Sequence, residues 1–223
     1  MATELSGSEL MADPQLVRAD RHLLAANVLA GTCLLAPLAV PSIVIAFRRL
    51  NELAGRGRLV RPWTVTIVAM FAMIDAGANF WGWSVDVFAH DVPLIQTFHN
   101  LWGKIAEGGY YIDYNSTPIG GYGNAADKTL QVLGLLFAYP MRMAAGWGFL
   151  KMKRWGLQAM IYSTFIHMAF LASYVAMYCL QFELAAGSSL FGPLGYWAIA
   201  LPMTSSFVTL PYLITLRREG FWD

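Results

Sequence analysis

Four side chains able to carry a charge or orient a substrate lie inside strongly apolar stretches of this chain. The segment FAMIDAGANFWGW (residues 71–83) contains Asp75 and, one helical turn later, Asn79. Arg142 and His167 lie in two further apolar stretches. Ionisable groups in such surroundings are costly, and they usually face a partner, a cavity or the interior of a helix bundle. A carboxyl group near a histidine or an arginine favours acid–base chemistry, in which a positioned side chain exchanges a proton with a substrate.

Patterns typical of several other chemistries are missing from the sequence. It contains no G-x-S-x-G nucleophile elbow, no phosphate-binding loop and no dinucleotide fingerprint. The two cysteines, Cys33 and Cys179, lie in separate apolar runs and form no CxxC pair. We therefore predict no cofactor and no metal site. A net charge of +1 gives no reason to expect a nucleic-acid partner.

The elements that must position these side chains are predicted to be membrane helices. The chain is 57% hydrophobic and 13% charged, whereas about 25% of the residues of a soluble domain carry charge. A bilayer core of roughly 30 Å requires about 20 apolar residues in a helix. The prediction is an all-α, polytopic bundle of five transmembrane helices, with spans at about 22–47, 62–90, 129–150, 155–182 and 194–216.

Basic residues orient the predicted bundle. Five arginines lie in loop 48–61, three basic residues in loop 151–154 and two arginines at 217–218. Five spans place these groups on one side, which the positive-inside rule identifies as cytoplasmic. The polar tail 1–21 and the long loop 91–128 are then non-cytoplasmic, and the tail 217–223 is cytoplasmic. We expect a short amphipathic helix in the first half of the long loop.

The predicted spans bring several polar groups to one level of the membrane. At 1.5 Å per residue, Asp75 and His167 each lie roughly 20 Å from the cytoplasmic end of their spans. Thr204 lies at about 20 Å, and Arg142 lies at about 14 Å with a long side chain that extends further. Asp75 is therefore interpreted in three ways. It is an ion pair with Arg142 that joins two helices, a proton donor or acceptor in a substrate cavity, or a neutral carboxyl group hydrogen-bonded to a neighbour. For His167, a structural hydrogen bond and a role in the site are both open.

Five segments follow one another in the order and spacing of a known membrane family. They are residues 74–79, LWGKIAEGGYYI (101–112), QVLGLLFAYP (131–140), FLKMKRWGLQAMIYSTFIH (149–167) and PLGYWAIALPMTSSFVTLP (193–211). In these segments the chain resembles the EXPERA superfamily, which includes the emopamil-binding protein, a sterol Δ8-Δ7 isomerase, and the sigma-2 receptor. The resemblance covers roughly residues 65–216 and implies a lipophilic cavity between helices.

The resemblance also implies positions for site residues, although their chemistry differs from that of the family. The family's membrane histidine, two glutamates, asparagine and tryptophan correspond here to Asp75, Asn79, Gln131, Thr204 and Phe207. Because the isomerase's charge pattern is replaced, the resemblance does not imply sterol isomerase activity. Trp83 and Trp197 lie near the inferred cavity, and each is interpreted either as a cavity-lining residue or as part of ordinary helix packing.

Three functions remain open from the sequence. The first is an isomerase or cyclase that acts on a lipophilic terpenoid, sterol or polyketide. Asp75 and His167 would be its catalytic residues, and Arg142 would join Asn79, Gln131 and Thr204 in binding substrate. The second is a non-catalytic sterol or lipid binder of the sigma-2 receptor kind. The third is a helical subunit of a larger membrane complex. Membrane lipids are expected partners, a homodimer is left open, and the location would be the endoplasmic reticulum membrane or a bacterial inner membrane.

Overall fold

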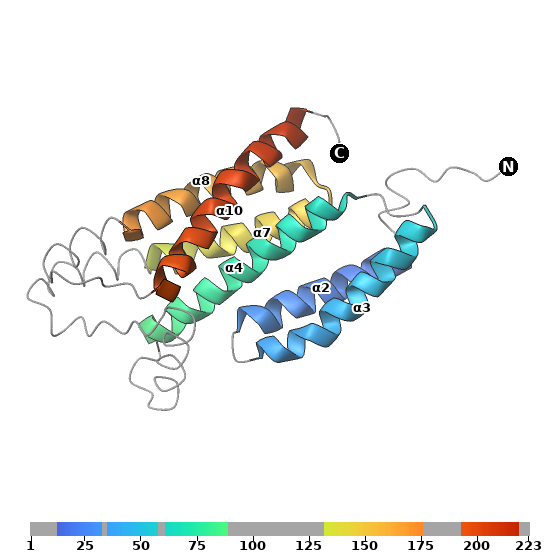
Figure 1. Ribbon diagram of the computed structural model, residues 1–223, viewed down its shortest axis with the longest axis horizontal. Coiled ribbons are helices and arrows are strands. Elements are labelled where there is room, and N and C mark those ends of the chain that lie inside the picture. Colours follow the sequence, from blue (N-terminus) through green and yellow to red (C-terminus); the bar gives the residue numbers. More distant parts are fainter. Residues whose placement is uncertain (1–12, 33–34, 58–60, 89–131, 176–192, 219–223) are drawn as a thin grey trace, which may run out of the picture. The chain divides into compact units, whose positions relative to one another are not determined.

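The computed structural model of the protein describes residues 13–32, 35–57, 61–88, 132–175 and 193–218 (Figure 1). These residues are helical and contain no β-strand, which agrees with the predicted all-α class. The helices, in chain order, are α2 (Pro14–Gly31), α3 (Ala36–Gly55), α4 (Trp63–Phe88), the π-helical turn η1 (Gly134–Ala138), α7 (Tyr139–Leu150), α8 (Arg154–Val175) and α10 (Pro193–Arg218).

The first predicted span requires a correction, because the structure divides it between two helices. Helix α2 ends at Gly31 and α3 begins at Ala36, so residues 22–47 do not form one continuous helix. The Thr32 backbone N–H donates to the Val28 carbonyl (3.2 Å), and the Thr32 hydroxyl donates to the Leu29 carbonyl (2.7 Å). Pro37 lies in the first turn of α3, where its missing N–H costs nothing, and it disfavours a helical conformation just before it.

The predicted N-terminal tail also requires a correction, because α2 begins at Pro14. Residues 14–21 were expected to belong to a polar tail, and they form the first turns of α2. Asp13 caps the helix by accepting a hydrogen bond from the Gln15 N–H (2.8 Å). Pro14 occupies the first helical position, where its fixed φ suits a helix. Residues 1–12 of the predicted tail and the whole of loop 91–128 lie outside the described residues.

Proline residues have different effects along the chain. Pro41 lies inside α3 without ending it, and α10 continues through Pro202 and Pro211. Pro140 has no N–H to give the carbonyl of Leu136, and the π-helical turn η1 lies directly before it. A wider turn of this kind re-pairs backbone groups that a regular α-helix would leave without a partner.

One helix in the described part of the chain is long and apolar enough to cross a membrane. It is the segment Trp63–Trp81 of α4, and the finding rests on length and composition alone. Buried core helices of water-soluble proteins meet the same two conditions, so the five membrane spans remain a prediction.

The helices divide between two compact units. The first unit contains α2, α3, α4 as far as Trp81, α7 from Arg142 onward, and α8 as far as Met160. In this unit α2 and α3 pack against each other as an antiparallel hairpin (Figure 1). Its core contains many small side chains, which allow helices to approach closely. The alanines among these buried residues are Ala19, Ala26, Ala39, Ala46, Ala69, Ala72, Ala76 and Ala145.

Glycines mark the closest helix contacts of the first unit. A Cβ atom added to Gly31 would lie 3.1 Å from the backbone of Gly77, so α2 and α4 meet at these two residues. A Cβ atom on Gly146 of α7 would lie 3.3 Å from the Ala69 carbonyl oxygen of α4 and would overlap the Met73 side chain. Side chains larger than hydrogen would therefore force α2 and α7 away from α4.

Helices α7 and α8 are joined by a three-residue turn at residues 151–153. Met152 in this turn has a φ of 55°, a left-handed conformation that is uncommon for a residue with a Cβ atom. Gly148 and Gly156 lie on either side of the turn, and a Cβ atom on Gly156 would overlap the backbone of Gly148. The first turns of α8 can therefore pack closely against the last turn of α7.

The second unit contains the rest of the chain, including η1, α8 from Ile161 onward and α10. Several polar side chains of this unit are buried. They are Ser163, Thr164 and His167 of α8 and Ser206 of α10.

Candidate functional site

Helix α4 presents a carboxylate and an amide from consecutive turns. The Asn79 Nδ2 donates to the backbone carbonyl of Asp75 (2.8 Å) and lies 3.2 Å from the Asp75 Oδ1. The spacing of four residues places both side chains on one face of the helix. The amide therefore limits the rotation of the carboxylate while leaving its second oxygen to face another helix.

The second oxygen of Asp75 faces Arg142 on α7. The Arg142 Nε lies 3.6 Å from the Asp75 Oδ2, and the two side chains are 3% and 10% exposed. This distance is an ion-pair distance and exceeds the usual N–H···O range of 2.7–3.2 Å. The pairing of Asp75 with Arg142 that the sequence suggested is thus present, with a longer separation than a direct hydrogen bond would have.

Close packing of α7 on α4 brings the two charges together. Gly146 follows Arg142 by one helical turn, so both residues lie on the same face of α7. Gly146 has no side chain, and the α7 backbone therefore approaches Ala69 and Met73 of α4. Met73 precedes Asp75 by two residues, which sets the level at which the arginine meets the carboxylate.

This arrangement can hold a charged carboxylate in an apolar helix and present it to a bound molecule. Arg142 faces the negative charge of Asp75, with its Nε 3.6 Å from the Asp75 Oδ2. The Asn79 amide contacts the other carboxyl oxygen, Oδ1, and so fixes the orientation of the carboxyl group. A carboxylate positioned in this way is suited to accept or deliver a proton.

The other predicted site residues differ in how the structure presents them. His167 is buried on α8 at 5% exposure and belongs to the second unit. Phe207 of α10 is 59% exposed, and its place in a cavity remains a prediction. Gln131 and the side chains of Trp83, Trp197 and Thr204 lie outside the described part.

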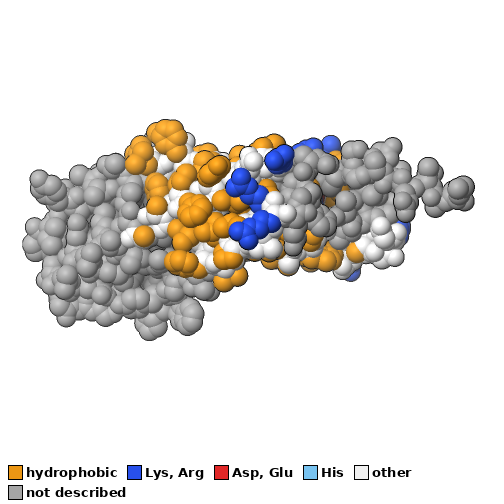
Figure 2. All heavy atoms as spheres, turned by 90° about the horizontal axis from the view of Figure 1, so that it is seen from above, with side chains coloured by type: hydrophobic (Ala, Val, Ile, Leu, Met, Phe, Trp, Pro, Cys, Tyr) orange, Lys and Arg blue, Asp and Glu red, His pale blue; other side chains and the backbone are white. Residues whose placement is uncertain are grey.

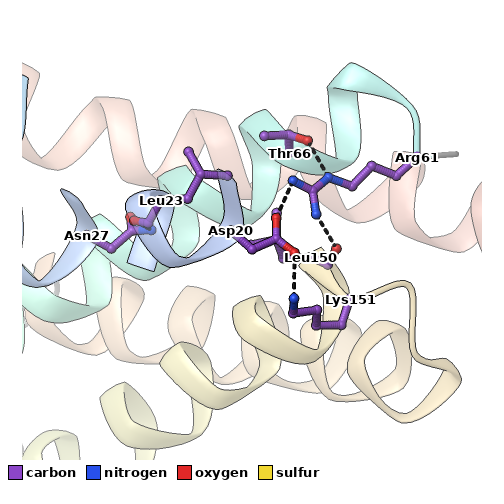
Figure 3. Close-up of polar contacts among 7 residues, drawn as sticks. All are labelled: Asp20, Leu23, Asn27, Arg61, Thr66, Leu150 and Lys151. Atoms are coloured by element: carbon purple, nitrogen blue, oxygen red, sulfur yellow. Dashed lines mark hydrogen bonds and ion pairs between the residues drawn. The ribbon is translucent and has the colours of Figure 1, made fainter. Parts of the chain in front are cut away.

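A second cluster of charges, which the sequence analysis did not identify, lies in the same unit (Figure 3). The Arg61 Nη2 lies 2.6 Å from the Asp20 Oδ1, and the Lys151 Nζ donates to the Asp20 Oδ2 (2.5 Å). Arg61 also donates from Nε to the Thr66 hydroxyl (2.9 Å) and from Nη1 to the Leu150 carbonyl (3.0 Å). The cluster therefore joins α2, the start of α4 and the end of α7.

Burial distinguishes the members of this ion cluster, which is defined by Asp20, Arg61 and Lys151. The Asp20 and Arg61 side chains are fully buried, whereas the Lys151 side chain is 24% exposed. The Lys151 Nζ also lies 4.9 Å from the centre of the Trp147 ring, within the range of a cation–π contact. Two cations share one carboxylate, so the cluster carries an excess positive charge at its exposed member.

The sequence contains a signal for this cluster in the spacing of α2. Leu16, Asp20, Leu23 and Asn27 follow one another at intervals of three or four residues, and all are buried. These intervals place them on one face of a helix. Asp20 therefore belongs to the buried face of α2, and its charge requires a partner. The prediction missed it because residues 1–21 were interpreted as a tail.

Comparisons with known proteins leave the family open, because no protein-family model, no curated protein and no solved structure matches this chain.

Proposed function

We propose that this chain is an integral membrane protein of the EXPERA type that transfers a proton to or from a lipophilic polycyclic substrate. The observation that carries the proposal is the Asp75 carboxylate within the apolar helix α4, oriented by Asn79 and faced by Arg142. The substrate would be a terpenoid, a sterol or a polyketide, and the reaction an isomerisation or a cyclisation without a cofactor.

The exposed surface supports the membrane part of the proposal. Large hydrophobic side chains are exposed on several helices, among them Ile67 and Phe71 of α4 and Tyr162 and Phe165 of α8. On the face drawn in Figure 2, exposed hydrophobic side chains adjoin a group of Lys and Arg side chains. Extended apolar surfaces are rare on soluble monomers and are suited to lipid acyl chains, with basic groups near the headgroups. The membrane would be the endoplasmic reticulum or a bacterial inner membrane.

The proposed reaction uses the charges of the site in separate roles. Asp75 would exchange a proton with an alkene, epoxide or enol of the substrate, and Asn79 would hold the carboxyl group in orientation. Arg142 would balance the negative charge that Asp75 carries whenever its carboxyl group is deprotonated. One positioned acid or base contributes about 10²–10⁴-fold to a rate, and a preorganised apolar surrounding adds to this.

The first experiment compares the wild type with the Asp75→Asn variant. Both are purified in mild detergent and incubated with a lipid extract of the source organism, and new isomers are identified by mass spectrometry. We expect a product that the wild type forms and that Asp75→Asn does not form. Glu52→Gln, which removes an exposed carboxylate of α3, is the matched control and should retain the wild-type conversion.

A double variant separates catalysis from stability. Asp75→Asn leaves Arg142 buried without its counter-charge, which destabilises the protein. Asp75→Asn/Arg142→Met removes both charges and should recover most of the thermal stability. Product that stays absent from this stable double variant would support proton transfer by Asp75. Product that returns together with the stability would contradict the proposal and make the pair structural.

Non-catalytic binding of a sterol or another lipid is the second candidate function. It is favoured by the contacts of Asp75, whose two oxygens already face Asn79 and Arg142. In this case the wild type and the Asp75→Asn/Arg142→Met variant would co-purify with the same lipid, and neither would convert it.

A further inference from the structure

The polar ends of the α2–α3 hairpin lie beside the first turns of α4. In α2, Asp20 is paired with Arg61, which also donates to Thr66 of α4. In α3, the Phe47 ring stacks on the Trp63 ring with the centroids 5.6 Å apart and an interplanar angle of 14°. Both helices of the hairpin therefore reach the level at which α4 begins.

The other end of the hairpin is placed by the glycine contact. Asp20 and Gly31 are eleven residues apart in α2, and Thr66 and Gly77 are eleven residues apart in α4. Since Asp20 lies near Thr66 and Gly31 packs on Gly77, α2 runs parallel to α4 over about 16 Å. Helix α3 returns over a similar distance, because Ala36 is also eleven residues from Phe47.

The α2–α3 hairpin extends along α4 over a distance that is smaller than the thickness of a membrane. Trp63 lies about 5 Å before Thr66, so Gly31, which packs on Gly77, lies roughly 20 Å along α4 from Trp63. The hydrocarbon core is about 30 Å thick. Helix α2 has 18 residues and α3 has 20, and α4 alone among the described helices is long and apolar enough for a full crossing. A hairpin of this depth would turn inside the hydrocarbon.

The described residues around the turn suit such a position. The Thr32 hydroxyl is hydrogen-bonded to the Leu29 carbonyl, and the Leu38 N–H donates to the Leu35 carbonyl (2.9 Å). Internal pairing of this kind is required of polar groups at membrane depth.

The outer surface of the hairpin is apolar along its length and basic at its polar end. The hydrophobic side chains exposed on it are Leu24, Val28, Leu35, Leu38, Val40, Val44 and Ile45, with exposures of 39–60%. Arg18, Arg21 and Arg48 are exposed near the level of Trp63. Apolar side chains fit lipid acyl chains, and arginines at one end fit headgroup phosphates.

We infer that the α2–α3 hairpin is a re-entrant element that lies against the acyl chains of a single leaflet. It enters the membrane from the side that holds Arg61 and reverses direction between the end of α2 at Gly31 and the start of α3 at Ala36. It then returns to the same side. The inference rests on the membrane placement of α4 proposed above. It places the start of α2 on the same side as Arg56, opposite to the side predicted for the N-terminal tail.

Single cysteines test this topology in a chain that also carries Cys33→Ser and Cys179→Ser. Arg18→Cys and Glu52→Cys report the two polar ends, and Leu35→Cys reports the turn; all three positions are exposed. A membrane-impermeant maleimide is added to sealed vesicles of known orientation, first from outside and then from inside. Size-exclusion profiles matching the wild type show that each variant is folded.

We expect Arg18→Cys and Glu52→Cys to react from the same side, and Leu35→Cys to react from neither side until detergent is added. Labelling of Leu35→Cys from the side opposite to Glu52→Cys would show a complete crossing and overturn the inference. Labelling of Arg18→Cys and Glu52→Cys from opposite sides would also overturn the inference and support one membrane crossing over residues 22–47. Release of the chain by alkaline carbonate would instead contradict the membrane placement itself.

Discussion

Asp20 and Asp75 are both carboxylates held by arginines within the same unit, but their surroundings differ. Asp20 is fully buried and lies 2.5–2.6 Å from two cations, one of which, Arg61, is further fixed by Thr66 and Leu150. Asp75 is 10% exposed and lies 3.6 Å from its arginine. The difference indicates that the Asp20 cluster serves to join helices. The pair at Asp75 is longer, joins α4 to α7, and belongs to the site proposed for proton transfer.

Removing the Asp20 charge should have the largest effect. Asp20→Asn leaves Arg61 and Lys151 without a counter-charge, and loss of one partner of a buried pair costs about 3–5 kcal/mol. We expect a large drop in the thermal unfolding temperature in detergent, measured by the loss of the monodisperse peak after heating. Arg21→Gln, at an exposed neighbouring position, is the control. Unchanged unfolding of Asp20→Asn would remove the distinction between the two carboxylates.

Replacing Arg142 should have an intermediate effect on stability. Arg142→Met removes the cation that faces the Asp75 carboxylate, and a buried group that loses a partner costs at least about 1–3 kcal/mol. The loss should be smaller than for Asp20→Asn, because the pair is longer and its carboxylate is partly exposed. The same heating assay measures it. An equal or larger loss would mean that the Asp75 pair also holds helices together.

Replacing Lys151 separates the two cations of the Asp20 cluster. Lys151→Met removes one ion pair and the contact with Trp147, yet Arg61 still balances the Asp20 charge. Partly exposed pairs contribute up to about 1 kcal/mol. We therefore expect a modest decrease in the unfolding temperature, well below that of Asp20→Asn. A decrease as large as that of Asp20→Asn would show that Lys151 is the essential partner.

Replacing Asn79 should change stability least. Asn79→Ala removes the contacts of the Asn79 Nδ2 with the Asp75 carboxylate and carbonyl within one helix, and the higher helix propensity of alanine offsets part of that loss. The conversion of substrate, measured as product per hour in the lipid-extract assay, should fall more clearly than the unfolding temperature. A loss of stability with unchanged conversion would assign Asn79 to packing.

The sequence predicts the later helices well. The expected starts at 62, 155 and 194 agree within one residue with Trp63, Arg154 and Pro193, because arginines, tryptophans and prolines mark these boundaries. The Asp75–Arg142 pair is one of the three interpretations that the sequence leaves open for Asp75, and the structure contains it. The complete set of five membrane spans remains a prediction, as does the cavity that the resemblance implies.

The N-terminal hairpin could not be predicted in the same way. Residues 23–47 are almost continuously apolar, so composition favours one long helix, whereas α2 ends at Gly31, the residue that packs on Gly77 of α4. The partners of Asp20 could not be predicted either. The sequence places Arg61 and Lys151 in basic loops, where they are interpreted as charges that orient the bundle in the membrane. Tertiary packing determines that these two basic residues face inward.

The separation of the Asp20 partners along the chain has a consequence for biogenesis. Lys151 follows Asp20 by 131 residues, and the Leu150 carbonyl that accepts from Arg61 follows that arginine by 89 residues. During synthesis from the N-terminus, Arg61 leaves the ribosome long before either of these groups. We therefore expect α2, α3 and α4 to associate first through Asp20 and Arg61. The end of α7, with Leu150 and Lys151, would then bind to this pair and complete the ion cluster late in folding.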